Sequence, residues 1–212
     1  MRRVDPQYLS SHKNIRFSKT EVLHIVVAIA VLAAAFSLIM RDNKLVSDPT
    51  TNIMLIVGIS FLLVICSFLF HELGHKFVAQ RYKAWSEFRV YPMGLIIALV
   101  FSVMGFLFAA PGAVYIRGNI DKEMNGKISL AGPAVNFVIA AVAIVVTLAL
   151  APQTIMWFVF YMLAYLNAVL GLFNMIPVLP FDGSKIVAWS IPVYIVVAII
   201  GAVELITVWF YL

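Results

Sequence analysis

The segment His71-Glu72-Leu73-Gly74-His75 has the residue types and the spacing of a metal-dependent hydrolytic site. Residues at positions i and i+4 lie on one face of an α-helix, so both imidazoles can reach one metal ion. Glu72 is placed between them to hold an activated water molecule and to accept its proton. We therefore expect one Zn²⁺ per chain, with His71 and His75 as metal ligands and Glu72 as the catalytic residue. A buried polar cluster that joins neighbouring helices is the alternative interpretation.

A zinc ion held by two histidines needs a third protein ligand and keeps its fourth position for water. The chain has few acidic residues, and Asp182 is the best candidate among them. It follows Pro177 and Pro180, which cannot both continue a helix, so the backbone should open just before the carboxylate. Such backbone suits a ligand that must reach sideways inside a membrane. The alternative is a simple Asp-Gly-Ser turn that begins the last helix.

Two asparagines in apolar surroundings add to this candidate site. Asn174 precedes the proline pair, and we expect it to bind substrate by donating to a peptide carbonyl or to the oxyanion formed on attack. Asn136 follows a run of small residues, so a hydrogen bond between helices, in support of the site, is its favoured role. Glu204 lies in the last apolar segment, and no role is assigned to it.

Composition indicates a protein that crosses a membrane several times. Of 212 residues, 63% are hydrophobic and only 12% are charged, against about 25% in ordinary soluble domains. Disordered chains are poor in apolar residues, so disorder is excluded. The net charge of +5 comes partly from a basic tail beside a membrane span, and we expect a lipid surface rather than nucleic acid as its partner. The single cysteine, Cys66, excludes an internal disulfide.

The expected fold is an all-α polytopic membrane protein with about five or six transmembrane helices around a three-helix catalytic core. A basic cytoplasmic tail covers residues 1–20, a first span and outer loop cover 21–52, the catalytic membrane core covers 53–186, and a last span covers 187–212. Within the core, we expect a zinc helix at 53–82, a re-entrant and strand region at 84–120, spans at 128–150 and 155–176, and an unwound segment at 174–184 that carries the aspartate.

The distribution of basic residues decides the topology. If the apolar segment 93–110 dips into the membrane and returns, thirteen of the 15 Lys and Arg residues lie on the cytoplasmic side with the N-terminus. The metal site requires the same arrangement, because the His pair and Asp182 must lie at the same depth. Segments 86–91 and 113–117 are then expected to be short strands that flank the re-entrant segment. The alternative is that 93–110 forms an ordinary sixth span.

The motifs resemble those of the site-2 protease family of intramembrane zinc metalloproteases. The resemblance covers roughly residues 53–186 and rests on the His-Glu-Leu-Gly-His segment at 71–75, Gly-Pro-Ala-Val-Asn at 132–136, and Asn174-x-x-Pro177-x-x-Pro180-x-Asp182-Gly183. Phe181 stands where the family usually has Leu, and Ser184 replaces a frequent second Gly.

The resemblance implies that His71, His75 and Asp182 bind zinc, that Glu72 is the general base, and that Asn174 holds the substrate backbone. Relatives hold their substrate as an added strand beside the segment that corresponds to residues 86–117. The chain offers no segment for a PDZ or nucleotide-binding domain, so a minimal core is expected.

The expected function is that of a zinc-dependent intramembrane endopeptidase in a prokaryotic cell membrane. Its substrate would be a single-span membrane protein, cut within its transmembrane segment in regulated intramembrane proteolysis, and its active site would open to the cytoplasm. A catalytically idle zinc-binding adaptor and a metal-binding transporter are the alternatives. A structural zinc site has no use for Glu72, and a transport path would need polar residues on both sides of the site. The oligomeric state is not predicted.

Overall fold

The computed structural model describes residues 16–41, 53–106 and 110–212. Within these residues, five helices are long and apolar enough to cross a membrane: Lys19–Met40, Ile53–Arg81, Lys122–Ala149, Ile155–Asn174 and Ile191–Tyr211. The predicted class, an all-α polytopic membrane protein, is confirmed. Most of the predicted basic tail and outer loop, and part of the re-entrant region, lie outside the described residues.

The elements follow one another along the chain with few residues between them. In order, they are α2 (Lys19–Met40), α3 (Ile53–Val64), the π-helix η1 (Ile65–Leu69), α4 (Phe70–Arg81), β1 (Trp85–Val90), α5 (Pro92–Val103), β2 (Gly112–Arg117), α6 (Lys122–Ala149), α7 (Ile155–Asn174), α8 (Asp182–Trp189) and α9 (Ile191–Tyr211).

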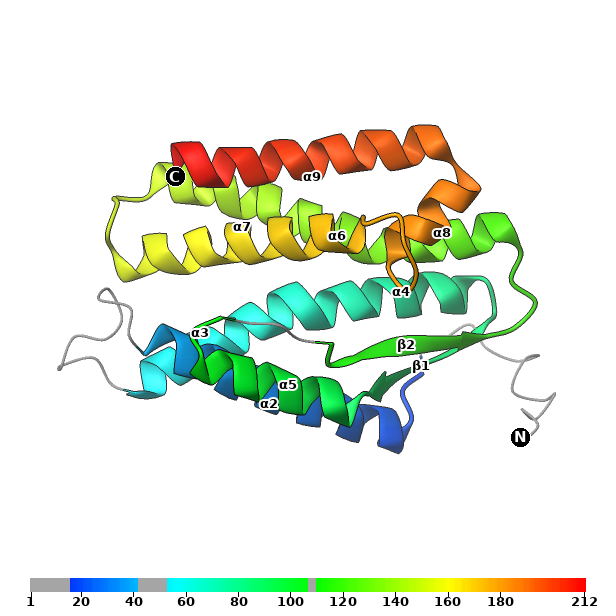
Figure 1. Cartoon of the computed structure of the whole chain (residues 1–212), viewed down its shortest axis with the longest axis horizontal. Coiled ribbons are helices and arrows are strands. Elements are labelled where there is room, and N and C mark those ends of the chain that lie inside the picture. The colour runs from blue at the N-terminus through cyan, green and yellow to red at the C-terminus, as the bar shows by residue number, and fades with distance from the viewer. Residues whose placement is uncertain (1–15, 42–52, 107–109) are drawn as a thin grey trace.

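The helices form two layers with α4 between them (Figure 1). One layer holds α6, α7 and α9, and the other holds α2, α3 and α5. Elements α3, η1 and α4 form one continuous helical segment that runs from the second layer to the centre, about 44 Å long at 1.5 Å per residue. This segment therefore joins the two layers and carries the His-Glu-Leu-Gly-His motif.

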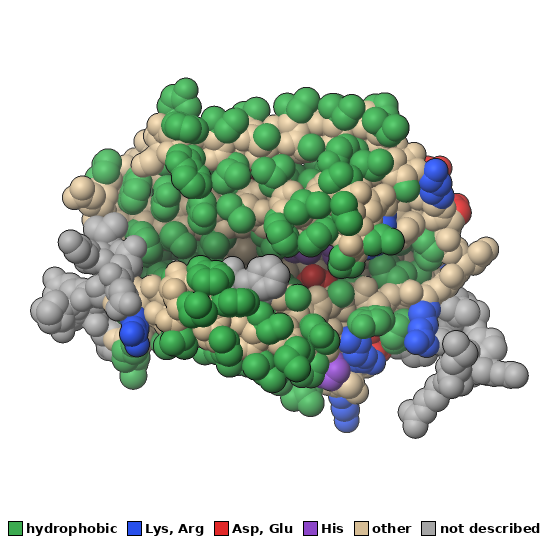
Figure 2. Space-filling model, in the orientation of Figure 1, with side chains coloured by type: hydrophobic (Ala, Val, Ile, Leu, Met, Phe, Trp, Pro, Cys, Tyr) green, Lys and Arg blue, Asp and Glu red, His purple; other side chains and the backbone are tan. Residues whose placement is uncertain are grey.

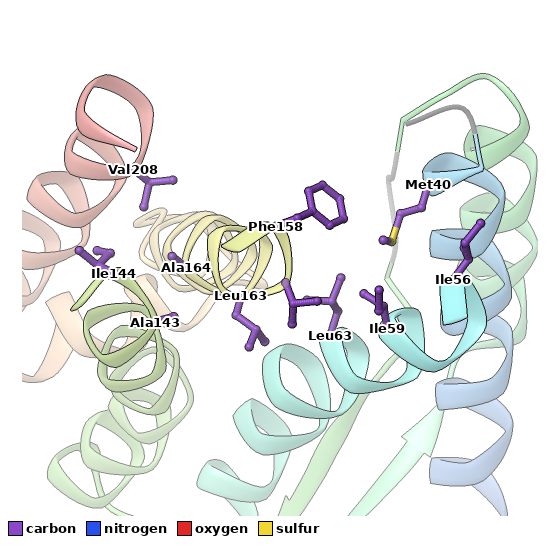
Figure 3. Packing of buried hydrophobic residues seen from close by; sticks show 11 residues of the cluster. Met40, Ile56, Ile59, Leu63, Ala143, Ile144, Phe158, Leu163, Ala164 and Val208 are labelled. Carbon is purple, nitrogen blue, oxygen red and sulfur yellow. The ribbon is translucent and has the colours of Figure 1, made fainter. Parts of the chain in front are cut away.

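The largest apolar cluster among the described residues packs α3 against α7, and α7 against α6 and α9. Figure 3 shows Leu63 of α3 facing Leu163 of α7, with Ala143, Ala164 and Val208 behind them. Apolar burial drives helix association weakly in a bilayer, so close packing has to stabilise such contacts. Alanines in this cluster let the helices approach closely, and the cluster fixes the zinc helix between the two layers.

The segment between β1 and β2 leaves the two-stranded sheet at the end of β1 and returns to it beside that end, at the start of β2. The two strands pair antiparallel, with Val90 opposite Gly112, and Tyr91 N–H donates to the Pro111 carbonyl oxygen at 2.9 Å. Helix α5 lies between them and has 12 residues, about 18 Å, which is too short to cross a hydrocarbon core of about 30 Å. The predicted strands and the predicted return of this segment are both present.

Element ends differ from the prediction at two places. Helix α6 begins at Lys122 rather than at residue 128, because the Asp121 carboxylate caps it by accepting from Met124 N–H at 2.7 Å. The predicted last span, 187–212, is two helices, since α8 ends at Trp189 and α9 begins at Ile191. Pro192 suits the first turn of a helix but not its interior, which explains the break.

Candidate metal centre and active site

His71 and His75 lie one turn apart on α4, and their rings converge. Their Nε2 atoms are 3.0 Å apart, and both side chains are buried. The ring planes cross at 86°, so the two rings do not stack, and their Nε2 atoms point toward a common space. The helix therefore presents the pair on one face, as the spacing of the motif predicts.

Asp182 reaches the same space from the first residue of α8. Its Oδ2 atom lies 3.0 Å from His75 Nε2 and 3.5 Å from His71 Nε2. Residues 175–181 are not helical, as the proline pair predicts, and they return the chain from the end of α7 toward α4. The unwound segment predicted at 174–184 is therefore shorter, and Asp182 begins α8 instead of lying within that segment. A Cβ atom on Gly183 would lie 2.2 Å from the Met175 carbonyl oxygen, so this close return requires glycine.

The hydrogen bonds of the two rings show that the three groups suit a metal ion. His71 Nδ1 donates to Asn136 Oδ1 at 2.5 Å, and His75 Nδ1 donates to the Ile128 carbonyl oxygen at 2.8 Å. Each ring proton is therefore held on Nδ1, and each Nε2 presents its lone pair to the Asp182 carboxylate. Three electron-rich atoms face one another and need a cation between them.

The donor set also matches zinc. The three ligand atoms lie within 4.8 Å of one another and are buried. Two imidazole nitrogens and one carboxylate form a known ligand set of catalytic zinc, which leaves a fourth position for water or substrate.

Asn136 orients His71 through a buried polar network. Its Nδ2 atom donates to the Ser67 carbonyl oxygen at 3.0 Å and to Asn167 Oδ1 at 2.7 Å, which leaves Oδ1 to accept from His71. Asn167 in turn donates to Ser67 Oγ at 2.9 Å. The network joins α6, α7 and η1 behind the metal ligands. Asn167 was not predicted from the sequence, although a polar side chain inside an apolar segment was a usable signal.

Replacing Asn136 by Leu is expected to lower zinc affinity about 10- to 100-fold, because His71 loses the acceptor that fixes its Nδ1 proton. Competition with a chromogenic chelator would measure the affinity. Thr147→Val is the matched control, since Thr147 is buried on the same helix but its hydroxyl donates to the Ala143 carbonyl oxygen, away from the His pair. Equal affinity of Asn136→Leu and wild type would show that Asn136 does not orient the ligand.

Two glycines let α4 and α6 approach each other at the site. A Cβ atom on Gly132 of α6 would lie 2.4 Å from His75 Nε2 and 2.7 Å from His71 Cε1. A Cβ atom on Gly74 of α4 would lie 2.8 Å from the Ala131 carbonyl oxygen. The space occupied by the His pair therefore exists because α6 has no side chain there.

Replacing Gly132 by Ala is expected to displace the imidazoles and reduce zinc affinity at least about tenfold, because the new methyl group overlaps the metal-facing nitrogen. Zinc titration would measure this, with circular dichroism to follow the helix content. Gly58→Ala is the control, since a Cβ atom at Gly58 on α3 meets nothing within 4 Å. Unchanged zinc binding in Gly132→Ala would contradict the arrangement of the site.

Glu72 is half-buried beside the His pair and faces the β-ribbon. Its Oε2 atom accepts from Val114 N–H of β2 at 3.1 Å. A small pocket borders this carboxylate and is lined mainly by apolar side chains, among them Phe68, Leu73 and Phe88. Figure 2 shows His and acidic side chains in a hollow between the two layers, open on this face of the molecule.

Asn174 forms its side-chain hydrogen bond within its own helix and not with the metal group. It is the last residue of α7 and half-buried, and its Nδ2 atom donates to the Leu170 carbonyl oxygen at 2.9 Å within its own helix. To bind substrate, the amide would have to release this bond. Its contact with substrate therefore stays a prediction.

Two further charged residues, Lys185 and Glu204, differ in their relation to the metal group. Lys185 Nζ lies 3.3 Å from Asp182 Oδ1, so it holds the carboxylate oxygen that does not face the histidines. Lys185 was not predicted as a site residue, although it lies one helical turn after Asp182. Glu204 is buried on α9, and its Oε2 atom has no hydrogen-bond partner among the described residues. Nothing in the structure links Glu204 to the metal group.

Comparisons with known proteins agree with this chemistry. The sequence profile of peptidase family M50 matches residues 149–193, which include Asp182. The protein "Putative zinc metalloprotease MJ0611" of Methanocaldococcus jannaschii is 40% identical over 177 residues, which cover 82% of this chain and 87% of that protein.

"Zinc metalloprotease MJ0392" of the same organism is 32% identical over 129 residues, which cover 61% of this chain and 33% of that protein. No solved structure matches the chain significantly. Because the 40% identity extends over most of both sequences, the chain belongs to peptidase family M50, the site-2 protease family of zinc-dependent metalloproteases.

Proposed function

We propose that this metalloprotease cuts a peptide bond within or beside the transmembrane segment of another membrane protein. One observation carries the proposal: the buried His pair lies on a helix, Ile53–Arg81, that is long and apolar enough to cross a membrane, and Asp182 of α8 meets the pair there. Charged and metal-binding groups are costly at that depth and need a function there.

In this proposal, His71, His75 and Asp182 hold the zinc ion, and Glu72 transfers the protons. Bound zinc supplies Lewis-acid polarisation of the scissile carbonyl group and of the attacking water. Glu72 takes a proton from the water and passes it to the leaving amine, which a half-buried carboxylate beside the ligands is placed to do. Asn174, on release from Leu170, would donate to the substrate backbone.

The substrate would bind in an extended conformation along the free edge of β2. A helical peptide bond is shielded by its own turns, so the cut segment has to unwind first. Val114 N–H points away from β1 and toward Glu72, which places the free edge of the ribbon beside the proposed base. Strand addition at such an edge supplies backbone hydrogen bonds without requiring a particular sequence.

The proposed orientation places the N-terminus and the opening of the site in the cytoplasm. On the face that Figure 2 shows, most of the visible Lys and Arg side chains lie toward the end of the molecule where β1 and β2 lie, and the positive-inside rule favours a cytoplasmic position for that end. The proposed partners are a single-span membrane protein and the lipid bilayer of a prokaryotic cell. Apolar side chains cover much of the outer surface, as contact with lipid requires (Figure 2).

Reconstitution with a single-span peptide in liposomes tests this function. Mass spectrometry of the products should place the cut within the apolar segment or close to its cytoplasmic end. A water-soluble peptide that carries only the polar flank of the same substrate should remain intact. Cleavage of the soluble flank, with the apolar segment left whole, would contradict the proposed site of action.

A further inference from the structure

A buried ion pair lies one helical turn beyond Glu72. Lys76 Nζ donates to Glu21 Oε2 at 2.9 Å, and the side chains are 1% and 0% exposed. Buried ion pairs contribute little net stability, and apolar residues of similar volume often replace them without loss. The geometry of this pair therefore suggests a role besides stabilising the fold.

Each partner of the pair also binds the backbone of β1. Lys76 Nζ donates to the Ser86 carbonyl oxygen at 2.8 Å, and Glu21 Oε1 accepts from Phe88 N–H at 2.9 Å. His24 Nδ1 accepts from Val90 N–H at 3.4 Å on the same edge. Side chains of α2 and α4 thus bond to outward backbone groups of β1. On the outer edge of β2, Val114 N–H donates to Glu72, so a strand added along that edge would lie beside Glu72.

The ion pair and Glu72 lie on opposite edges of the same ribbon. Phe88 of β1 is directly opposite Val114 of β2. Phe88 N–H points outward to Glu21, and Val114 N–H points outward to Glu72. Glu72 and Lys76 are four residues apart on one face of α4. Contacts at residues 72 and 76 therefore fix the ribbon on the zinc helix at two successive turns.

We propose that Glu21 and Lys76 are positioning residues that set the register of β2 against Glu72, and thereby select which peptide bond of an added strand is cut. The inference rests on the proposed function, because it concerns a peptide bound to β2. An added strand repeats every two residues, so movement of the ribbon along α4 would bring a different peptide bond to the base.

The test replaces both partners together, Glu21→Leu with Lys76→Met, so that no buried charge is left unpaired. The double variant should bind zinc within about twofold of wild type, because the three ligands lie outside the network. Its rate at the original bond, at saturating substrate, should fall about 10- to 100-fold as alignment is lost. New cuts should appear at neighbouring bonds of the same single-span peptide, read by mass spectrometry.

Gln80→Ala is the matched control. Gln80 lies on the same face of α4 one turn further on, but among the described residues its side chain bonds to the backbone of Arg16 and not to β1. We expect its cut site to equal that of wild type. If the Leu/Met pair does not yield folded, zinc-loaded protein, Glu21→Gln with Lys76→Gln takes its place, since two amides keep a donor and an acceptor without charge.

If the double variant cuts only at the wild-type bond, the proposal is overturned, whether the rate is unchanged or reduced. A pair that only stabilises the fold would change the amount of folded protein and not the position of the cut. Failure of wild type itself to cut any membrane peptide, with zinc bound, would instead refute the proposed function. Zinc content and the wild-type reaction therefore separate the two failures.

Discussion

Replacing Glu72 by Gln is expected to abolish cleavage while zinc stays bound. The amide has nearly the shape of the carboxylate but cannot accept a proton from water at neutral pH, and a positioned general base contributes about 10²- to 10⁴-fold. Glu72 is not one of the three residues whose ligand atoms converge, and its carboxylate accepts a hydrogen bond from Val114 N–H. Metal content should therefore equal that of wild type.

Cleavage of a single-span peptide and zinc content of the same sample would measure both effects. Glu123→Gln is the matched control, because Glu123 is an exposed carboxylate on α6 that pairs with Lys127. Its activity should equal that of wild type. Normal turnover by Glu72→Gln would show that Glu72 is not the general base. If zinc-bound wild type cleaves none of the peptides, the catalytically idle adaptor is favoured instead.

Replacing Asp182 by Asn is expected to lower zinc affinity more than about a hundredfold and to abolish cleavage with it. Loss of a group that only orients a ligand costs about 10- to 100-fold, and Asp182 contributes a ligand atom itself. The amide keeps the volume but removes the negative charge that faces His71 and His75 at 3.5 and 3.0 Å.

Asp121→Asn distinguishes a local effect from general instability. Asp121 accepts from Met124 N–H at the start of α6 and does not touch the metal group, so this variant should bind zinc normally. Zinc titration of both variants gives the comparison. Wild-type affinity in Asp182→Asn would assign the third ligand to another residue.

Local spacing was enough to predict the centre of the site. His71 and His75 share a helix face because they are four residues apart, and Pro177 and Pro180 open the backbone before Asp182. The return of the segment predicted at 93–110 followed from charge balance and from the common depth of the expected ligands, and the strands were predicted from the short runs that flank it.

Contacts between distant segments could not be predicted in this way. Asn136 and Asn167 are 31 residues apart, and Glu21 and Lys76 are 55 residues apart, so only the packing of the helices reveals that they meet. The π-helical turn at Ile65–Leu69 has no signal in an apolar run. The break between α8 and α9, by contrast, had a usable signal in Pro192, which suits the first turn of a helix and not its interior.

Metal dependence of cleavage in the membrane tests the central claim most directly. Purified protein, reconstituted with a single-span peptide, would be assayed as isolated, after a chelator has removed its zinc, and after zinc is restored. The account predicts one zinc per chain, a cut in or beside the apolar segment, loss of the cut with the metal, and recovery on its return. Undiminished cleavage by protein stripped of zinc would contradict it.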